Sequence, residues 1–330
     1  GYATAPKAYY DAITGWFRRR HGWQIRPEWV LHTTGVIPAL SAVIKALTQP
    51  GDKVLIQTPV YNHFFTSIHN SGCQAAESLL VYRDNTYTID FDDLERKAAD
   101  PTVKLMLLCN PHNPAGRVWT PAELRRIGEL CLRHDVVVVA DEIHCELVMP
   151  GFSYTPFASL CEEFERSSVT CTSPSKAFNL AGLQVANIFA ADAALRARIG
   201  HSLQINETGE IGPFAIEALI AAYDEGAEWL DALNEYLHDN YRFLREYFDR
   251  NLPQYPVLPL EGTYLVWVDC RASGLTSDEL ETKLLEEAKL RINPGSIYGE
   301  AGRDFIRLNI ACPRKLLAEG LDRLRKVLKR

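Results

Sequence analysis

The chain has 330 residues, of which 47% are hydrophobic and 23% are charged, and its formal net charge is −7. This is the composition of a globular protein that is long enough for a large core and two domains. The negative net charge does not indicate a basic surface that would bind nucleic acid. No apolar run approaches the roughly 20 residues that span a bilayer.

The eight cysteines form no C-x-x-C pair, and several lie inside apolar runs such as "LMLLC". Buried free thiols in a reducing compartment are therefore expected, rather than a disulfide framework. No secretory signal is visible, although the sequence opens at Gly1 and not at Met, so an earlier targeting segment would not be seen. These features predict a cytoplasmic protein.

The first clear elements are a helix, a Pro-Gly-Asp turn and a strand within residues 40–61. Three short strands follow at 103–108, 136–140 and 168–172, and each is continuously apolar or β-branched, as strands buried on both faces are. Between the first two lies a helix that starts with a capping box: Thr120 is the N-cap, Pro121 takes the first position and Glu123 the third. This order of elements predicts a βαβ unit and a mainly parallel sheet.

The C-terminal part of the chain has a different organisation. A long helix is expected from about Ala227 to Arg250, followed by a strand, a helix, a strand and a closing helix between residues 263 and 328. We therefore expect an α/β protein with a large domain over residues 1–235 and a smaller C-terminal α/β domain over residues 236–330.

Polar side chains follow the three buried strands. They are Asn113 after the first strand, Asp141 and His144 after the second, and Ser173, Ser175 and Lys176 after the third. Ligands of open parallel sheets bind beyond the carboxyl ends of the strands. Each of these residues is ordinary by itself, and a lysine after a strand is usually a solvated surface residue. Together they indicate a binding or catalytic site.

The residue types in this group suit one cofactor. A buried amine such as that of Lys176 is useful when it is neutral, because it then attacks an aldehyde. A carboxylate on the neighbouring strand, Asp141, would keep a pyridine nitrogen protonated, and pyridoxal 5′-phosphate needs both groups. A phosphate cup is available where Gly35 precedes a helix start, and Tyr61 after a strand offers an aromatic face. A plain helix entry and core packing are the ordinary alternatives for Gly35 and Tyr61.

Four motifs that recur in order over most of the chain resemble the fold type I pyridoxal-phosphate enzymes of the class I/II aminotransferase superfamily: "NPHNPAG", "DEIH", "TSPSKAFNLAGL" and "FIRLNIACP". The stretches "NPHNPAGRVWT", "DEIHCELV", "SKAFNLAGL" and "GSIYGEAGRDFIRLN" are most similar to the cystathionine β-lyase (carbon–sulfur lyase) subgroup typified by the MalY and PatB proteins. This resemblance implies a large domain with a seven-stranded type of sheet sandwiched by helices, and a homodimer with shared active sites.

The resemblance also implies a role for each matching residue. Lys176 would carry the cofactor and move protons, Asp141 would pair with the pyridine nitrogen, and Arg307 would bind the substrate's α-carboxylate. Asn113 would contact the phenolic oxygen of the ring, and His144 stands where many aminotransferases have a tyrosine on that oxygen. The remaining cofactor contacts would come from Tyr61 stacked on the ring, from the phosphate ligands Gly35, Val36, Ile37, Ser173 and Ser175, and from Tyr2, which would reach the phosphate of the neighbouring subunit.

Two features depart from the family pattern. Many aminotransferases have a phosphate-binding arginine eight residues after the lysine, where this sequence has Gln184. The phosphate charge would therefore be balanced differently. The chains of the family also begin several dozen residues earlier, with a segment that lies over the active site, and the sequence that opens at Gly1 lacks this segment.

Three other interpretations compete. Ser173 and Lys176 have the S-x-x-K spacing of penicillin-binding proteins, but the Lys-Thr-Gly element of those enzymes does not occur in the sequence. "DEIHCE" contains several potential metal ligands, but such side chains diverge where a strand becomes a loop, and a buried, hydrogen-bonded histidine is an equal alternative for His144. A cofactor-binding scaffold without catalysis would not require both Lys176 and Asp141.

We therefore expect a carbon–sulfur lyase that cleaves cystathionine or cysteine S-conjugates by β-elimination into a thiol, pyruvate and ammonia. The alternative is an aminotransferase of L-amino acids. Lys176 and Asp141 serve both reactions, so these two residues do not decide between them. No metal, nucleic acid or membrane partner is expected.

Overall fold

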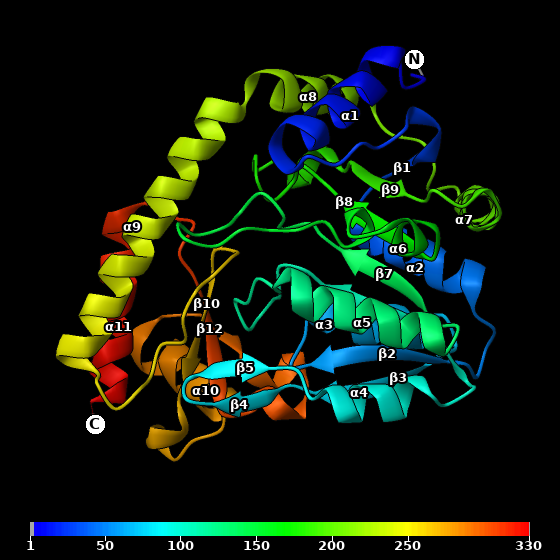
Figure 1. Ribbon diagram of the computed structural model, residues 1–330. Helices are drawn as coiled ribbons and strands as arrows, with labels where there is room; N and C mark the ends of the chain where they lie inside the picture. The colour runs from blue at the N-terminus through cyan, green and yellow to red at the C-terminus, as the bar shows by residue number, and fades with distance from the viewer. Residues whose placement is uncertain (1–2, 330) are drawn as a thin grey trace.

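Seven strands form the central sheet of the computed structural model, which describes residues 3–329 (Figure 1). In spatial order they are β1 (Val30–Thr33), β9 (Ala186–Phe189), β8 (Ser168–Thr172), β7 (Val137–Asp141), β6 (Val103–Cys109), β2 (Lys53–Thr58) and β3 (Gln74–Leu79). Strand β9 runs antiparallel to both of its neighbours, and the other pairs in the sheet are parallel. The prediction of a mainly parallel, seven-stranded sheet is confirmed.

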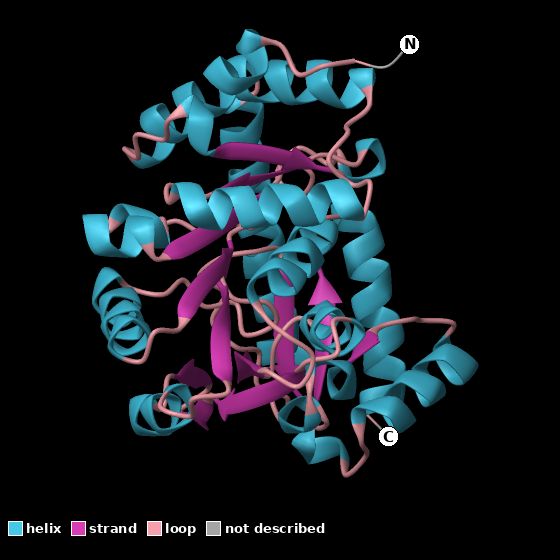
Figure 2. Ribbon diagram, turned by 90° about the vertical axis from the view of Figure 1, so that its right-hand side faces the viewer, coloured by secondary structure: helices cyan, strands magenta, loops and turns pink. Residues whose placement is uncertain are grey.

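The apolar strands are buried because helices cover both faces of the sheet (Figure 2). Successive side chains of a strand point to opposite faces, so Leu105 and Leu107 of β6 pack on one side, whereas Met106 and Leu108 pack on the other. The first face is covered by α2 (Val36–Leu47), α3 (Asn62–Asn70) and α7 (Ala193–Ile205). The second face is covered by α4 (Phe91–Ala98), α5 (Pro121–Arg133) and α6 (Glu162–Arg166). A short hairpin of β4 (Val81–Arg83) and β5 (Thr86–Thr88) lies next to β3 in the sequence.

Two helix starts agree with their sequence signals. Thr120 caps α5 in a capping box: its hydroxyl accepts the N–H of Glu123, whose carboxylate accepts the N–H of Thr120. Each bond satisfies a backbone donor that the first helical turn leaves free. Helix α2 begins directly after Gly35, with Pro38 in its first turn, and no side chain caps it. Its first N–H groups therefore remain available at the end of the helix.

The C-terminal unit is a second α/β layer. Strands β10 (Leu265–Asp269), β12 (Phe305–Asn309) and β11 (Asn293–Pro294) form an antiparallel sheet, covered by α10 (Ser277–Ala288) and α11 (Arg314–Leu328). The 25-residue helix α9 (Ala227–Asn251) runs along one side of the molecule to this unit (Figure 1). The boundary expected between residues 235 and 236 falls inside α9. Leu230 packs with the N-terminal helices and Leu237 with the C-terminal core, so the change of core occurs near that boundary.

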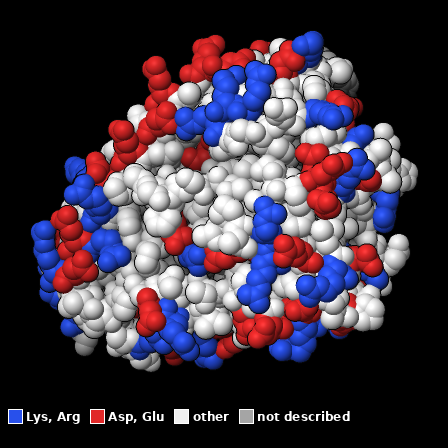
Figure 3. Space-filling view, in the orientation of Figure 1, with Lys and Arg blue, Asp and Glu red and all other residues white. Residues whose placement is uncertain are grey.

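Helix α1 (Lys7–His21) packs against α8 (Pro213–Glu225) beside strands β1 and β9 (Figure 1). All eight cysteines are free thiols. Positive and negative side chains are interspersed on the face in Figure 3, around a broad uncharged area. No helix among residues 3–329 combines the length and the apolar character needed to cross a membrane.

Candidate active site

Three parallel strands end at the same level and bring the predicted residues together. Cys109 of β6 is the neighbour of Asp141 of β7, and Asp141 is the neighbour of Cys171 of β8. The polar segments that follow these strands therefore meet at one edge of the sheet, where they line a cavity of about 360 Å³. The predicted residues that line it are Gly35, Val36, Ile37, Tyr61, Asn113, Asp141, His144, Ser173, Ser175, Lys176 and Arg307. Tyr2 lies outside the described residues.

The start of α2 forms one end of the cavity. Gly35, Val36 and Ile37 line the cavity at the positive end of the helix dipole, where backbone N–H groups favour an anion. Gln184, which stands in the place of an arginine, also lines the cavity. Ser173 is already engaged: its hydroxyl donates to the carbonyl of Val185 at 2.6 Å and accepts the N–H of Ser175 at 3.1 Å. Ser173 therefore braces the loop that precedes Lys176, besides facing the cavity.

Asp141 is a carboxyl group without enough solvation to ionise easily. It is 4% exposed, and burial raises its pKa to about 7 in the absence of any ligand. Two weaker effects oppose this shift: the N–H of Ile143 donates to Oδ1 at 3.2 Å, and the positive charge of Lys176 lies nearby. A cation placed against this carboxyl would favour its ionised form. A protonated pyridine nitrogen is such a cation, so the site fits pyridoxal phosphate.

His144 is neutral at physiological pH. Burial, together with the positive charges of Lys176 and Arg307, lowers its pKa to about 3. Its ring lies edge-on to Tyr264, with ring centroids 5.8 Å apart. The Nδ1 atom has no hydrogen-bond partner among the residues that the structure describes, which leaves it available to a ligand in the cavity. On the other side of the site, burial raises the pKa of Tyr61 to about 12.

Arg307 reaches the cavity from β12 in the C-terminal unit. Its Nη1 donates to Oδ1 of Asn113 at 3.0 Å, and its Nη2 donates to Oδ1 of Asn293 at 3.2 Å. The guanidinium lies over the ring of Tyr298, with Cζ 5.0 Å from the centroid. Burial lowers the pKa of Arg307, and its Nε has no partner among the described residues. The side chain is therefore held in place while part of its fork remains free for a carboxylate.

Among the cavity residues that the sequence did not predict are Cys109 and Tyr264. Cys109 closes an apolar strand and looked like an ordinary buried thiol; burial and the nearby Asp141 raise its pKa. Tyr264 precedes β10 by one residue, and only the folded arrangement brings it against His144. No local motif marks either residue.

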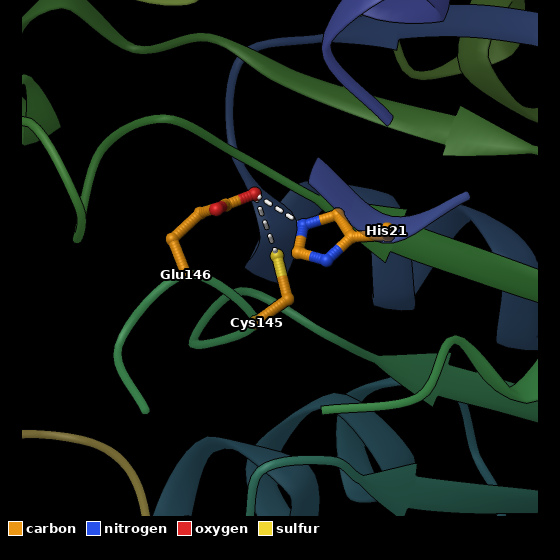
Figure 4. A group of neighbouring side chains, drawn as sticks. All are labelled: His21, Cys145 and Glu146. Carbon is orange, nitrogen blue, oxygen red and sulfur yellow. Dashed lines mark hydrogen bonds and ion pairs between the residues drawn. The ribbon is translucent and has the colours of Figure 1, made fainter. Parts of the chain in front are cut away.

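The structure also revises the expectation for "DEIHCE". Asp141 and His144 face the cavity. The side chains of Cys145 and Glu146, which were expected to point away from any other potential metal ligand, do not. They converge with His21 of α1, and the ligand atoms of these three residues lie within 4.8 Å of one another (Figure 4). The expectation overlooked a partner that is 125 positions away from Glu146 in the sequence.

The raised pKa of Asp141 predicts how the stability of the cofactor-free protein depends on pH. The carboxyl of an unfolded chain loses its proton near pH 3.9, whereas folded Asp141 keeps it up to about pH 7. Between these values the folded state binds more protons, so its free energy of unfolding falls as pH rises. Urea unfolding between pH 4 and 7 measures the slope of the free energy of unfolding against pH. In Asp141→Asn this slope should be less steep than in the wild type, by at most about 1.4 kcal/mol per pH unit.

Part of the pH dependence should survive in Asp141→Asn, because burial also raises the pKa of Glu142 to about 7. Asp249→Asn, on the exposed surface of α9, serves as the matched control and should leave the slope unchanged. Equal slopes for the wild type and Asp141→Asn would contradict the account.

Comparison with known proteins places this site in a family. Residues 2–324 match the aminotransferase class I and II family. The chain is 43% identical to cystathionine beta-lyase PatB of Bacillus subtilis, over 99% of its length and 85% of that protein. It is 35% identical to protein MalY of Escherichia coli, over 95% of its length and 80% of that protein. The structure of cystalysin from Treponema denticola, which contains pyridoxal 5′-phosphate, superposes with a TM-score of 0.98 at 37% identity, covering 100% of this chain and 84% of that one. The chain therefore belongs to the aminotransferase class I and II family.

Proposed function

We propose that this protein is a pyridoxal-phosphate-dependent carbon–sulfur lyase that acts on cystathionine or on S-conjugates of cysteine. The observation that carries the proposal is one cavity lined by Lys176, Asp141 and Arg307, in a chain that is 43% identical to a cystathionine beta-lyase. The bound cofactor would withdraw electrons from the substrate's α-carbon. The chain's own residues would supply the binding, the orientation and the proton transfers.

Each step of this reaction can be assigned to a residue of the cavity. Arg307 would hold the α-carboxylate of the substrate, because its planar fork matches a carboxylate and is already fixed by Asn113. The amine of Lys176 would accept the proton from the α-carbon. The carboxylate of Asp141 would hold a proton on the ring nitrogen. The β-carbon–sulfur bond then breaks, the electron pair leaves with sulfur as a thiolate, and the three-carbon remainder takes up water to give pyruvate and ammonia.

The remaining cavity residues would hold the cofactor. The phosphate would lie at the start of α2, against Gly35, Val36 and Ile37. Ser175 would donate its hydroxyl, and Ser173 would add a second hydroxyl by turning its proton from the carbonyl of Val185 to the phosphate. Tyr61 would stack on the ring, and Asn113 and His144 would face its phenolic oxygen. A neutral His144 suits this place because it adds no positive charge beside Lys176.

We also propose that the protein is a cytoplasmic homodimer. Eight free thiols, six of them buried, suit a reducing compartment. The dimer proposal rests on Tyr2, whose family counterpart completes the phosphate site of the neighbouring subunit. Residues 1–235 would form the cofactor-binding domain and residues 236–330 the smaller domain that carries Arg307.

The reaction type is tested by turnover without a second substrate. Elimination restores the cofactor in each cycle, whereas transamination leaves it in its amine form until a keto acid arrives. With L-cystathionine alone, the cofactor-loaded protein should release homocysteine, pyruvate and ammonia over many turnovers, and Lys176→Ala should release none. A reaction that requires pyruvate or 2-oxoglutarate, with sulfur retained in the product, would identify an aminotransferase instead.

The oligomeric state is tested by sedimentation at micromolar concentration, which should show a dimer as the dominant species of the cofactor-loaded protein. Tyr2→Phe should weaken cofactor binding without changing sedimentation, because it would remove the hydroxyl proposed to contact the phosphate and keep the aromatic ring. A fully active monomer would refute the shared-site proposal.

A further inference from the structure

A second buried polar cluster, formed by His21, Cys145 and Glu146, lies beside the turn that follows β7, residues 142–147 (Figure 4). None of its three residues lines the cavity. The centre of the cluster is the carboxylate of Glu146. Oε1 of Glu146 accepts the indole N–H of Trp16 at 2.6 Å and lies 2.7 Å from Nε2 of His21. Because a carboxylate only accepts, the imidazole donates. The side chains of His21 and Glu146 are 9% and 6% exposed. Both hydrogen bonds therefore lie in a region of low dielectric, where they are stronger than in water.

The cluster holds the turn that carries the catalytic residues after β7. Two consecutive backbone bonds form this turn: the N–H of Cys145 donates to the carbonyl of Glu142, and the N–H of Leu147 donates to the carbonyl of His144. The backbone carbonyl of Glu146 accepts the side-chain amide of Asn234 from α9 at 2.9 Å. Glu146 therefore joins α1 and α9 to the turn that presents Asp141 and His144 to the cavity.

A second carboxylate anchors the beginning of the same turn. Glu142 accepts hydrogen bonds from the side-chain amide of Asn110 and from the N–H of Phe157, both at 3.0 Å, and from the hydroxyl of Tyr154. The ring of His21 lies edge-on to Tyr154, with centroids 5.0 Å apart, so the two anchors touch. The turn is fixed at both ends by groups that do not enter the cavity.

The cluster also contacts the lysine loop. Trp16 packs edge-on against Phe178, with ring centroids 5.8 Å apart. The N–H of Phe178 donates to the carbonyl of Pro174 at 2.9 Å, which closes the turn that contains Lys176. One tryptophan of α1 thus bonds to the turn of Asp141 and packs against the turn of Lys176.

We propose that Glu146, with His21 and Trp16, positions the turn of Asp141 and His144 relative to Lys176 in the active site. These three are positioning residues, because none of them lines the cavity. The role rests on the proposed function, since the residues that they position are the ones that would hold the cofactor. The hydrogen bonds of Glu142 and Glu146 fix the backbone of this segment, and the fixed backbone holds Asp141 and His144 in the cavity.

A divalent metal ion is the competing occupant of the cluster, because a histidine, a cysteine and a glutamate are ligands that zinc accepts. The geometry favours hydrogen bonds. Two N–H groups converge on the same Oε1 at 2.6 and 2.7 Å, and the thiol of Cys145 lies 3.7 Å from that oxygen. Burial, with the charges of Glu146 and Glu142, raises the pKa of Cys145, so the hydrogen-bonded cluster holds it as a thiol.

The test compares Glu146→Gln, His21→Ala and His21→Gln with the wild type, each loaded with pyridoxal phosphate. The readouts are the visible circular dichroism of the bound cofactor, its dissociation constant, and kcat per bound cofactor and KM for cystathionine. Asp11→Asn is the matched control, because it removes the exposed ion pair between Lys7 and Asp11 on α1 without touching the cluster or the turn. If the wild type binds no cofactor, that result contradicts the proposed function. The positioning role is judged by the variants of a cofactor-loaded protein.

We expect Glu146→Gln and His21→Ala to reduce the circular dichroism band and to lower kcat per bound cofactor by up to about a hundredfold, the loss expected when a catalytic group moves by about 1 Å. KM should stay within about twofold, because Arg307 lies on a different element. Since a glutamine donates an N–H in place of the imidazole, His21→Gln should recover part of the loss. Asp11→Asn should match the wild type.

Two results would overturn the proposal. One is a wild-type band and a wild-type kcat per bound cofactor in both Glu146→Gln and His21→Ala, whatever their melting temperatures, because the cluster would then serve stability alone. The other is stoichiometric zinc in the purified wild type that is lost in Cys145→Ala. If Glu146→Gln does not fold, His21→Ala and its partial rescue by His21→Gln decide the question.

Discussion

The alignment of Cys109, Asp141 and Cys171 across three parallel strands is the constraint on which the active site depends. Parallel strands expose their carboxyl ends at one edge, and this alignment makes three of them end together. The chain then leaves the sheet at three adjacent points and returns a lysine, an acid and an amide to one cavity. A shift of one residue in any of these strands would turn its side chains to the opposite face.

Burial determines which groups of the site are ionised. The pKa of Asp141 is raised and that of His144 is lowered, so burial disfavours the charged form of each group. A cationic ring nitrogen would relieve the first penalty, and a hydrogen-bonding oxygen would satisfy the free Nδ1 of the second. Because such a ligand binds the folded state alone, it would also stabilise the protein. Of the cavity's polar atoms, Nδ1 of His144 and Nε of Arg307 have no hydrogen-bond partner among the described residues.

Contacts between distant segments keep this arrangement rigid. Arg307 and Asn113 are 194 positions apart, and their hydrogen bond joins the C-terminal unit to the loop after β6. In the turn that follows β7, Glu146 joins α1 and α9 to the residues that face the cavity. Asp141 and His144 therefore face the cavity, whereas Glu142 and Glu146 of the same segment anchor it to the rest of the protein.

Local signals predicted much of the fold and part of the site. The buried strands β6, β7 and β8 were readable because their runs are continuously apolar, and the start of α5 because Thr120 and Glu123 form a capping box. Strand β3 was not predicted, since it is an edge strand and most of its side chains are exposed.

The site residues divide in the same way. Asp141 and Lys176 were found from the residues that follow strands. Arg307 entered only through family resemblance, because nothing in its own segment indicates a partner far away in the sequence. The contacts of Tyr264 and His21 exist only once the chain is folded, and no short motif encodes them.

The central claim is that Lys176 is the amine that holds pyridoxal phosphate in this cavity. Borohydride reduction of the cofactor-loaded protein, followed by peptide mapping, tests it directly. The account predicts one pyridoxyl group per chain, on the peptide that contains Lys176, and no label at this position when the bound cofactor has been stripped from the protein before reduction. Stoichiometric label on a different lysine would contradict the assignment of the site.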